Sequence, residues 1–117
     1  TDETIYQLMS EMIDTTEHYI SSKQILNNIS TISRISVADI ISKKRNKEIV
    51  KIRQVIIYIC KLITSDSLNQ IGTLIGNREH TTILYSINKV EGMMSESQEY
   101  YDYVKDLLNK LEESIQA

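Results

Sequence analysis

Two polar segments of this sequence contain the side chains best suited to chemistry, and the chemistry is binding rather than catalysis. The first is the basic run over residues 43–47 (KKRNK), which Lys51 and Arg53 follow. The second covers residues 78–82 (REHTT) and comes shortly after Gly76. Clustered cations attract polyanions such as nucleic acid, and short hydrogen-bonding side chains can contact the edges of bases.

The distribution of charge favours a polyanionic partner more than the net charge does. The 117 residues carry a formal net charge of −3 at pH 7, which by itself argues against nucleic acid. Residues 34–61, however, contain eight basic and two acidic residues, whereas residues 1–33 contain one basic and five acidic residues. The alternative is that the basic run is only a solvated, charged face of the protein.

No set of residues in the sequence has the spacing of a catalytic or metal site. His18 and His80 are far apart, and no Cys or carboxylate stands at metal-ligand spacing from either of them. The phosphate-binding pattern Gly-x-x-x-x-Gly-Lys-Ser/Thr does not occur, so we expect no ATP site in this chain. The single cysteine, Cys60, lies in an apolar run, which predicts a buried and inert thiol. We therefore expect a binding module with no enzymatic activity, cofactor or metal.

The elements that position these residues are expected to be helices. The chain contains no Pro, Phe or Trp and only three Gly, and 41% of its residues are hydrophobic, which is enough for a core. Apolar residues recur at intervals of three and four, and capping residues precede several segments. This pattern predicts helices over residues 2–20, 21–33, 37–42, 49–63, 67–75 and 97–115, and a further helix that begins near residue 80. The expected fold is a single all-α domain, a compact bundle of six or seven helices.

The helix over residues 67–75 and the helix that begins near His80 have the pattern of a helix-turn-helix. Ser67 and Gln70 form a capping box at the start of the first helix. Gly76, which can adopt a positive φ, ends that helix. A turn of about four residues then leads into the second helix, although other helical hairpins share this pattern.

The second of these helices is expected to expose its first turn. Its buried stripe includes Ile83 and Ile87, so the side chains of residues 78–82 must point away from the core. A DNA-binding helix presents this end to the major groove, where threonine methyl groups pack against thymine methyl groups and glutamate accepts a hydrogen bond from cytosine. The alternative is that the two threonines only cap a surface helix and that His80 is a solvated histidine of the turn.

Residues 76–84 (GNREHTTIL) resemble the Gly-x-Arg-Asp-His-Thr-Thr-Val signature of the DNA-binding domain of DnaA, the bacterial replication initiator. Residues 35–45 (ISVADIISKKR) are similar to the Ile-x-Val-x-Asp-Leu-Leu-Ser-Lys-x-Arg segment of that family. The pair Arg53-Gln54 stands where the family has Arg-Gln, and residues 67–72 (SLNQIG) match its first helix-turn-helix element. The similarity extends over residues 23–115 and has no gap between residues 35 and 91.

The resemblance implies what the chain binds and which residues bind it. It implies a Trp-repressor-like helix-turn-helix that binds double-stranded DNA sequence-specifically, at DnaA-box-like sites used in replication initiation. Contacts to a groove or to base edges are implied for Arg45 in the minor groove and, in the major groove, for Glu79, His80, Thr81 and Thr82. Contacts to phosphates are implied for Lys43, Lys47, Arg53, Gln54, Ser67, Arg78 and Lys89.

Three positions depart from the family pattern. Glu79 replaces Asp, and its additional methylene group moves the hydrogen-bond acceptor. Ile52 stands where Pro is common, and Asn77 replaces Gly, although asparagine tolerates a left-handed backbone well. The alternative function is a helical protein-interaction or regulatory domain that has lost specific DNA binding, with the acidic ends of the chain and residues 100–103 (YYDY) as its surface.

The resemblance also implies a division of the chain near residue 22. Residues 1–22 are expected to form an amphipathic linker helix and residues 23–117 the DNA-binding domain, with any ATPase module outside this chain. The chain begins with Thr1 rather than Met, which favours a piece of a longer initiator over a free-standing domain. No apolar run approaches the roughly 20 residues of a membrane span. We therefore expect a cytoplasmic, nucleoid-associated protein without membrane contact, and a monomer for this domain alone.

Overall fold

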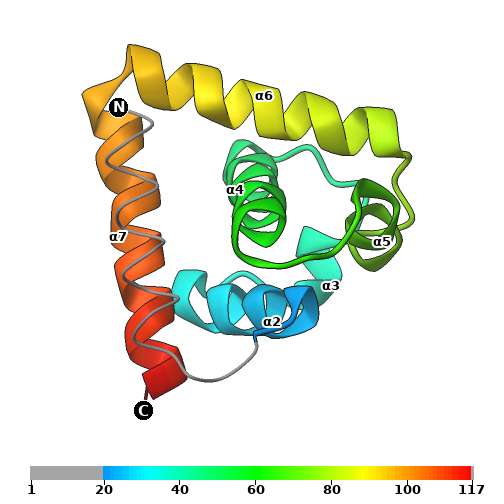
Figure 1. The fold of residues 1–117 in the computed structure, drawn as a ribbon, viewed down its shortest axis with the longest axis horizontal. Coiled ribbons are helices and arrows are strands. Elements are labelled where there is room, and N and C mark those ends of the chain that lie inside the picture. Colours follow the sequence, from blue (N-terminus) through cyan, green and yellow to red (C-terminus); the bar gives the residue numbers. More distant parts are fainter. Residues whose placement is uncertain (1–19, 117) are drawn as a thin grey trace.

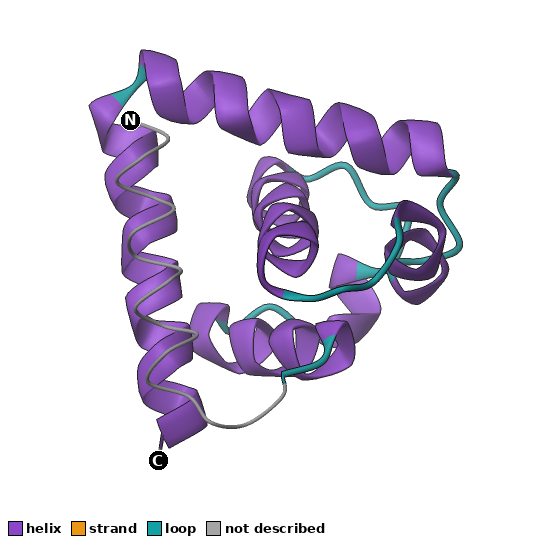
Figure 2. Ribbon diagram, viewed as in Figure 1, coloured by secondary structure: helices purple, strands orange, loops and turns teal. Residues whose placement is uncertain are grey.

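The computed structural model describes residues 20–116, which form helices joined by short loops (Figure 1). The helices, in chain order, are α2 (Ser22–Ser33), α3 (Val37–Ile40), α4 (Lys47–Ile63), α5 (Leu68–Leu74), α6 (His80–Glu96) and α7 (Gln98–Gln116). No strand occurs among the described residues (Figure 2), so the prediction of an all-α bundle is confirmed over this range. Residues 1–19 of the expected linker helix lie outside the described residues.

Helix α4 lies at the centre of the described structure. Figure 1 shows α6, α7 and α2 along three sides of α4, with α5 and α3 toward the remaining side. Because it is enclosed in this way, α4 buries every residue from Val55 to Cys60. A helix that is covered on most sides has the nearly continuous apolar sequence found here. The helix begins at Lys47, slightly before the expected residue 49, with Asn46 as its N-cap.

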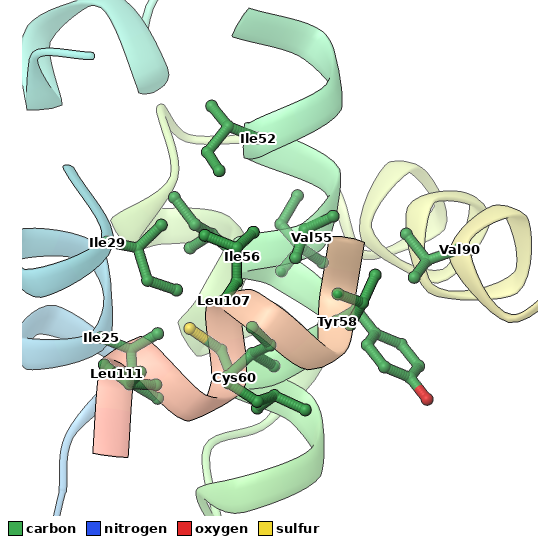
Figure 3. Close-up of a cluster of buried hydrophobic side chains, with 14 of the residues drawn as sticks. Ile25, Ile29, Ile52, Val55, Ile56, Tyr58, Cys60, Val90, Leu107 and Leu111 are labelled. Carbon is green, nitrogen blue, oxygen red and sulfur yellow. The ribbon is translucent and has the colours of Figure 1, made fainter. Parts of the chain in front are cut away.

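The core joins α4 to its larger neighbours. Figure 3 shows Ile25 and Ile29 of α2, Val90 of α6 and Leu111 of α7 around the buried face of α4. All four side chains are fully buried. Burial of one such side chain stabilises a fold by about 1.5–3 kcal/mol relative to leaving it in water. Helices separated by many residues in the sequence are thus held in one body.

The single thiol of the chain is part of this core. Cys60 is fully buried, and its sulfur lies 3.8 Å from the carbonyl oxygen of Ser22. Burial raises the pKa of the thiol to about 12. The predicted burial is confirmed, and a thiol that stays protonated at neutral pH is unreactive.

Serine caps begin several helices, as the sequence predicts. Ser21 and Ser36 each accept a hydrogen bond from the backbone N–H three residues later, at 3.1 Å. At α5 the capping box is complete: the Ser67 hydroxyl accepts from the Gln70 N–H at 3.1 Å, and the Gln70 side chain accepts from the Ser67 N–H at 2.7 Å. Such a cap contributes about 1 kcal/mol to the stability of a helix. The start of the helix-turn-helix is therefore set locally.

The buried stripe expected for α6 is confirmed, and α7 also buries one face. The buried residues of α6 include Ile83, Ile87, Val90 and Met94, and those of the last helix include Tyr101, Val104, Leu108 and Leu111. None of the described helices is both long enough and apolar enough to cross a membrane.

Candidate nucleic-acid interface

Helices α5 and α6 form a helix-turn-helix whose turn depends on two glycines. Gly76 has φ +76°, and Asn77, which follows it, has φ +55°, so both adopt the left-handed conformation that glycine and asparagine tolerate. The N–H of Arg78 donates to the carbonyl oxygen of Gly72 at 2.8 Å. A Cβ at Gly72 would overlap the carbonyl oxygen of Arg78. Glycine at position 72 therefore lets the chain fold back closely onto α5.

The first turn of α6 exposes a row of polar side chains. His80, Thr81 and Thr82 are exposed, whereas Ile83 is fully buried, so the predicted orientation of this helix is confirmed. Glu79 is the N-cap residue, and its side chain makes no capping hydrogen bond. The carboxylate is thus available to a partner. The free N–H groups of a helix N-terminus also attract phosphate.

The outward face of α6 continues with two apolar residues that the sequence analysis did not single out. Tyr85 is 60% exposed and Leu84 is 45% exposed. The Nζ of Lys89 lies 5.8 Å from the centre of the Tyr85 ring. Their sequence signal was their position off the buried stripe, with Leu84 at the end of the signature segment and Tyr85 directly after it. Apolar side chains on such a face can contact thymine methyl groups.

The basic run forms the loop between α3 and the first turn of α4. Lys43, Arg45 and Lys47 are exposed, and none of them has an ion-pair partner within residues 20–116. Lys44 is different, because its Nζ lies 2.8 Å from the Asp39 carboxylate. An exposed pair of this kind contributes at most about 1 kcal/mol. Several cations of the loop therefore remain available for phosphates.

Arg53 does not belong to this exposed set. Its side chain is 7% exposed. Its Nε donates to the carbonyl oxygen of Ile40 at 2.6 Å, and its Nη2 donates to those of Ser42 and Lys44, each at 3.0 Å. Burial, and secondly the charge of Arg78, lowers the pKa of Arg53. This differs from the expected phosphate contact, because a buried guanidinium that already donates to carbonyl groups is poorly placed to bind DNA.

Arg78 is also directed inward, so the prediction that the side chains of residues 78–82 all point away from the core is wrong for this residue. It is half-buried, and burial lowers its pKa. Its Nη1 donates to the carbonyl oxygen of Ile75 at 2.8 Å, and its Nη2 donates to that of Ser42 at 2.7 Å. Both Nη atoms of Arg78 therefore donate within the protein, and the phosphate contact expected for this residue stays a prediction. These bonds place the basic loop beside the turn that leads into α6.

The remaining expected phosphate contacts lie on three helices. Gln54 is half-buried on α4. Ser67 is exposed as the N-cap of α5, and its hydroxyl can still donate while it accepts from the Gln70 N–H. Lys89 is exposed on α6. In Figure 1 the loop that enters α4 extends to the side of the molecule where α5 meets α6.

No constellation for metal binding accompanies this surface. Over residues 20–116, no group of three or more His, Cys, Asp and Glu side chains could hold a metal ion. The polar residues of the turn and the cations of the loop can form hydrogen bonds and ion pairs.

The fold and the surface together define a helix-turn-helix binding domain with a basic loop beside its second helix.

Comparison with known proteins gives the family. Residues 22–90 match the family described as bacterial dnaA protein helix-turn-helix, and the chain belongs to this family. The resemblance found in the sequence is thereby confirmed, and the matched unit is a binding module rather than an enzyme.

Similar proteins carry the name chromosomal replication initiator protein DnaA. The protein of Clavibacter sepedonicus is 30% identical over 98 residues, which is 84% of this chain and 21% of that protein. The protein of Geobacter sp. (strain M21) is 33% identical over 105 residues, 90% of this chain and 23% of that protein. The protein of Rhodopseudomonas palustris (strain TIE-1) is 38% identical over 79 residues, 68% of this chain and 17% of that protein. The chain thus spans about a fifth of the length of these relatives.

Proposed function

We propose that this domain binds double-stranded DNA sequence-specifically, at DnaA-box-like sites in replication initiation. The observation that carries the proposal is the exposed polar first turn of α6 beside a loop of exposed cations. In this arrangement the N-terminus of α6 enters the major groove, and Arg45 enters the adjacent minor groove. A helix-turn-helix commonly docks in this way.

The side chains divide into two roles. Glu79 accepts a hydrogen bond from cytosine, while His80, Thr81 and Thr82 contact base edges or methyl groups. Lys43, Lys47, Gln54, Ser67 and Lys89 bind phosphates, which sets the position of the protein on the duplex. Arg45 is the cation suited to a narrow, A·T-rich minor groove.

The same proposal covers the larger protein. A chain that spans about a fifth of its relatives' length fits a DNA-binding module of a longer initiator whose ATPase module lies outside it. Residues 1–22 then join the two modules. We propose a cytoplasmic protein associated with the nucleoid, in which this domain is monomeric and needs no cofactor of its own.

The alternative is a protein-interaction or regulatory domain whose surface is the acidic ends of the chain and residues 100–103, and it finds less support at these tyrosines. Tyr100 is 6% exposed and Tyr101 is 8% exposed, so two of these tyrosines belong to the core. Tyr103 is half-buried, and the Nζ of Lys51 lies 4.0 Å from the centre of its ring. These side chains pack within the domain and present little free surface to a partner.

A binding assay at fixed salt tests the proposal. Fluorescence anisotropy with a DnaA-box duplex and a scrambled duplex should show affinities that differ by a factor of about 10³ or more. Lys105→Ala is a suitable control, because this exposed lysine lies on α7 and should leave the ratio unchanged. Equal affinities for both duplexes would reject sequence specificity, and no complex at low salt would reject DNA binding.

A further inference from the structure

One backbone carbonyl group links the basic loop to the helix-turn-helix. The carbonyl oxygen of Ser42 accepts a hydrogen bond from Arg53 Nη2 at 3.0 Å and another from Arg78 Nη2 at 2.7 Å. Arg53 belongs to α4, and Arg78 belongs to the turn before α6. Two guanidinium groups from different elements therefore meet at the start of the loop that carries Arg45.

Other contacts at the same place pack the start of the basic loop closely against the turn before α6. Arg53 also donates to the carbonyl oxygen of Lys44, and Arg78 also reaches that of Ile41 at 3.4 Å. A Cβ at Gly76 would overlap the carbonyl oxygen of Ile41. The backbone before the loop and the backbone of the turn are thus in direct contact, and the first part of the loop, as far as Lys44, is held.

We infer that Arg78 and Arg53 are positioning residues that hold the basic loop at one distance from α6. This inference rests on the proposed function, since it assigns Arg45 and the first turn of α6 to two grooves of one site. With the loop held, Arg45 meets the minor groove at a single spacing from the bases contacted by Thr81. The domain then recognises the spacing between its minor-groove site and its major-groove site, as well as the sequence of each.

The geometry of the donors explains why arginine is needed. A guanidinium group is planar and donates in several directions at once, so Arg78 bonds Ile75 and Ser42 together. A lysine ammonium at the same position keeps the charge but cannot span both carbonyl groups in the same way. These hydrogen bonds to the loop are formed without DNA, so less of the loop has to be fixed on binding.

The first test uses the unaltered protein and two duplexes. In the second duplex, one extra base pair separates the A·T-rich end of the site from the bases bound by α6. We expect this insertion to weaken binding by about tenfold to a hundredfold, as the loss of a specific contact does. The control is Arg45→Ala, which should bind both duplexes equally because it has no minor-groove contact to misplace. Equal binding of both duplexes by the unaltered protein would overturn the inference.

The second test measures coupling between residues. Arg78→Lys is combined with Arg45→Ala, and separately with Thr81→Ala, under conditions where melting curves show every variant folded. If Arg78 holds the loop, the affinity loss caused by Arg45→Ala should shrink at least threefold in the Arg78→Lys background. The loss caused by Thr81→Ala should change much less. Arg53→Lys serves as the second variant, and unchanged losses in both backgrounds would overturn the inference.

The third test needs no DNA and separates this inference from the proposed function. The N–H of Ser42 donates a hydrogen bond to the backbone carbonyl oxygen of Asp39, and the N–H of Lys44 donates one to the Ser42 hydroxyl, each at 3.2 Å. In Arg78→Lys, hydrogen exchange at these two amides should accelerate at least tenfold while the amides in the middle of α4 keep their rates. Unchanged exchange would show that the loop is not held by Arg78. Failure of the unaltered protein to bind any duplex would instead reject the proposed function and the recognition of spacing that rests on it, while the exchange rates would still show whether Arg78 holds the loop.

Discussion

The role of each basic residue depends on where its N–H groups lie, and not on its place in a charged run. Arg45 and Lys47 point to solvent from the loop and the first turn of α4. Arg53, a few residues later, is buried and donates to carbonyl groups of the loop. A buried arginine that donates to carbonyl groups can position the loop. An exposed cation without a partner can bind a polyanion. Two changes at the residue scale test this division.

Arg45→Ala and Lys47→Ala should have different effects on specificity. Loss of Arg45 should cost about 1–3 kcal/mol on a box with an A·T-rich end, because a minor-groove arginine senses groove width. Lys47→Ala should weaken all duplexes by a similar, smaller factor, because a phosphate contact contains no sequence information. Titrations of box and scrambled duplexes at one salt concentration measure both effects. A box-to-scrambled ratio unaffected by Arg45→Ala would contradict the minor-groove assignment.

Thr81→Ala should affect binding without affecting the fold. Thr81 is exposed, so its loss should change the free energy of unfolding by no more than about 0.5 kcal/mol. Binding to box DNA should weaken by about 1–3 kcal/mol, while binding to scrambled DNA, which depends on phosphate charge, should be almost unchanged. The matched control is Thr31→Ala, an exposed threonine of α2. A large fall in the melting temperature, or equal weakening on both duplexes, would show a structural role instead.

At the scale of the element, the turn between α5 and α6 decides whether the second helix is presented correctly. The capping box starts α5, and the close approach at Gly72 brings the turn back onto it. The buried side chain of Ile83 then anchors α6 beneath its exposed first turn. The exposed residues of α6 are therefore positioned by contacts that are themselves hidden from DNA.

Gly72→Ala should damage both stability and DNA binding. The added methyl group would overlap the backbone carbonyl of Arg78, which cannot move without shifting the start of α6. We expect a loss of about 1–3 kcal/mol in the free energy of unfolding and weaker binding to box DNA. Gly92→Ala in α6 is the control, because a Cβ added there meets no atom within 4 Å apart from its chain neighbours and the backbone of its own helix. That change should stabilise the domain by about 0.5–1 kcal/mol, and chemical denaturation measures both. Equal free energies of unfolding for the Gly72→Ala and Gly92→Ala variants would contradict the close approach at Gly72.

At the scale of the whole molecule, an acidic protein presents a local basic surface. The net charge is −3, yet the loop before α4 and the first turn of α4 expose Lys43, Arg45 and Lys47, which have no acidic partner in the described part of the chain. The exposed Lys89 on α6 adds a fourth cation to the same proposed interface. The partner of such a surface is attracted by local potential, since overall charge would repel it.

The slope of log K against log salt concentration should reflect the number of phosphates that these cations neutralise. Four cations and the N-terminus of α6 would neutralise about four or five phosphates, so log K should fall with log salt concentration with a slope of about −4. Arg53 and Arg78 are left out of this number because their N–H groups lie within the protein. Equilibrium titrations from low to moderate salt measure the slope. A slope near zero would reject the electrostatic part of the interface.

The sequence by itself determined the features that depend on neighbouring residues. The capping box of Ser67 and Gln70 predicted where α5 begins, and the spacing of Ile83 and Ile87 predicted which face of α6 is buried. These signals act over one or two helical turns, so they can be recognised without knowing the fold. The signature over residues 76–84 likewise indicated the family.

Only the tertiary structure showed where the side chains of Arg53, Arg78 and Tyr100 lie. Arg53 and Arg78 appeared to be phosphate ligands, because their charge is visible in the sequence and their partners are not. Arg78 lies 36 positions from Ser42, the residue whose carbonyl group it binds. Tyr100, expected on a surface under the alternative function, is buried. The destination of a long side chain depends on which distant backbone is folded beside it, and that is a property of packing rather than of local sequence.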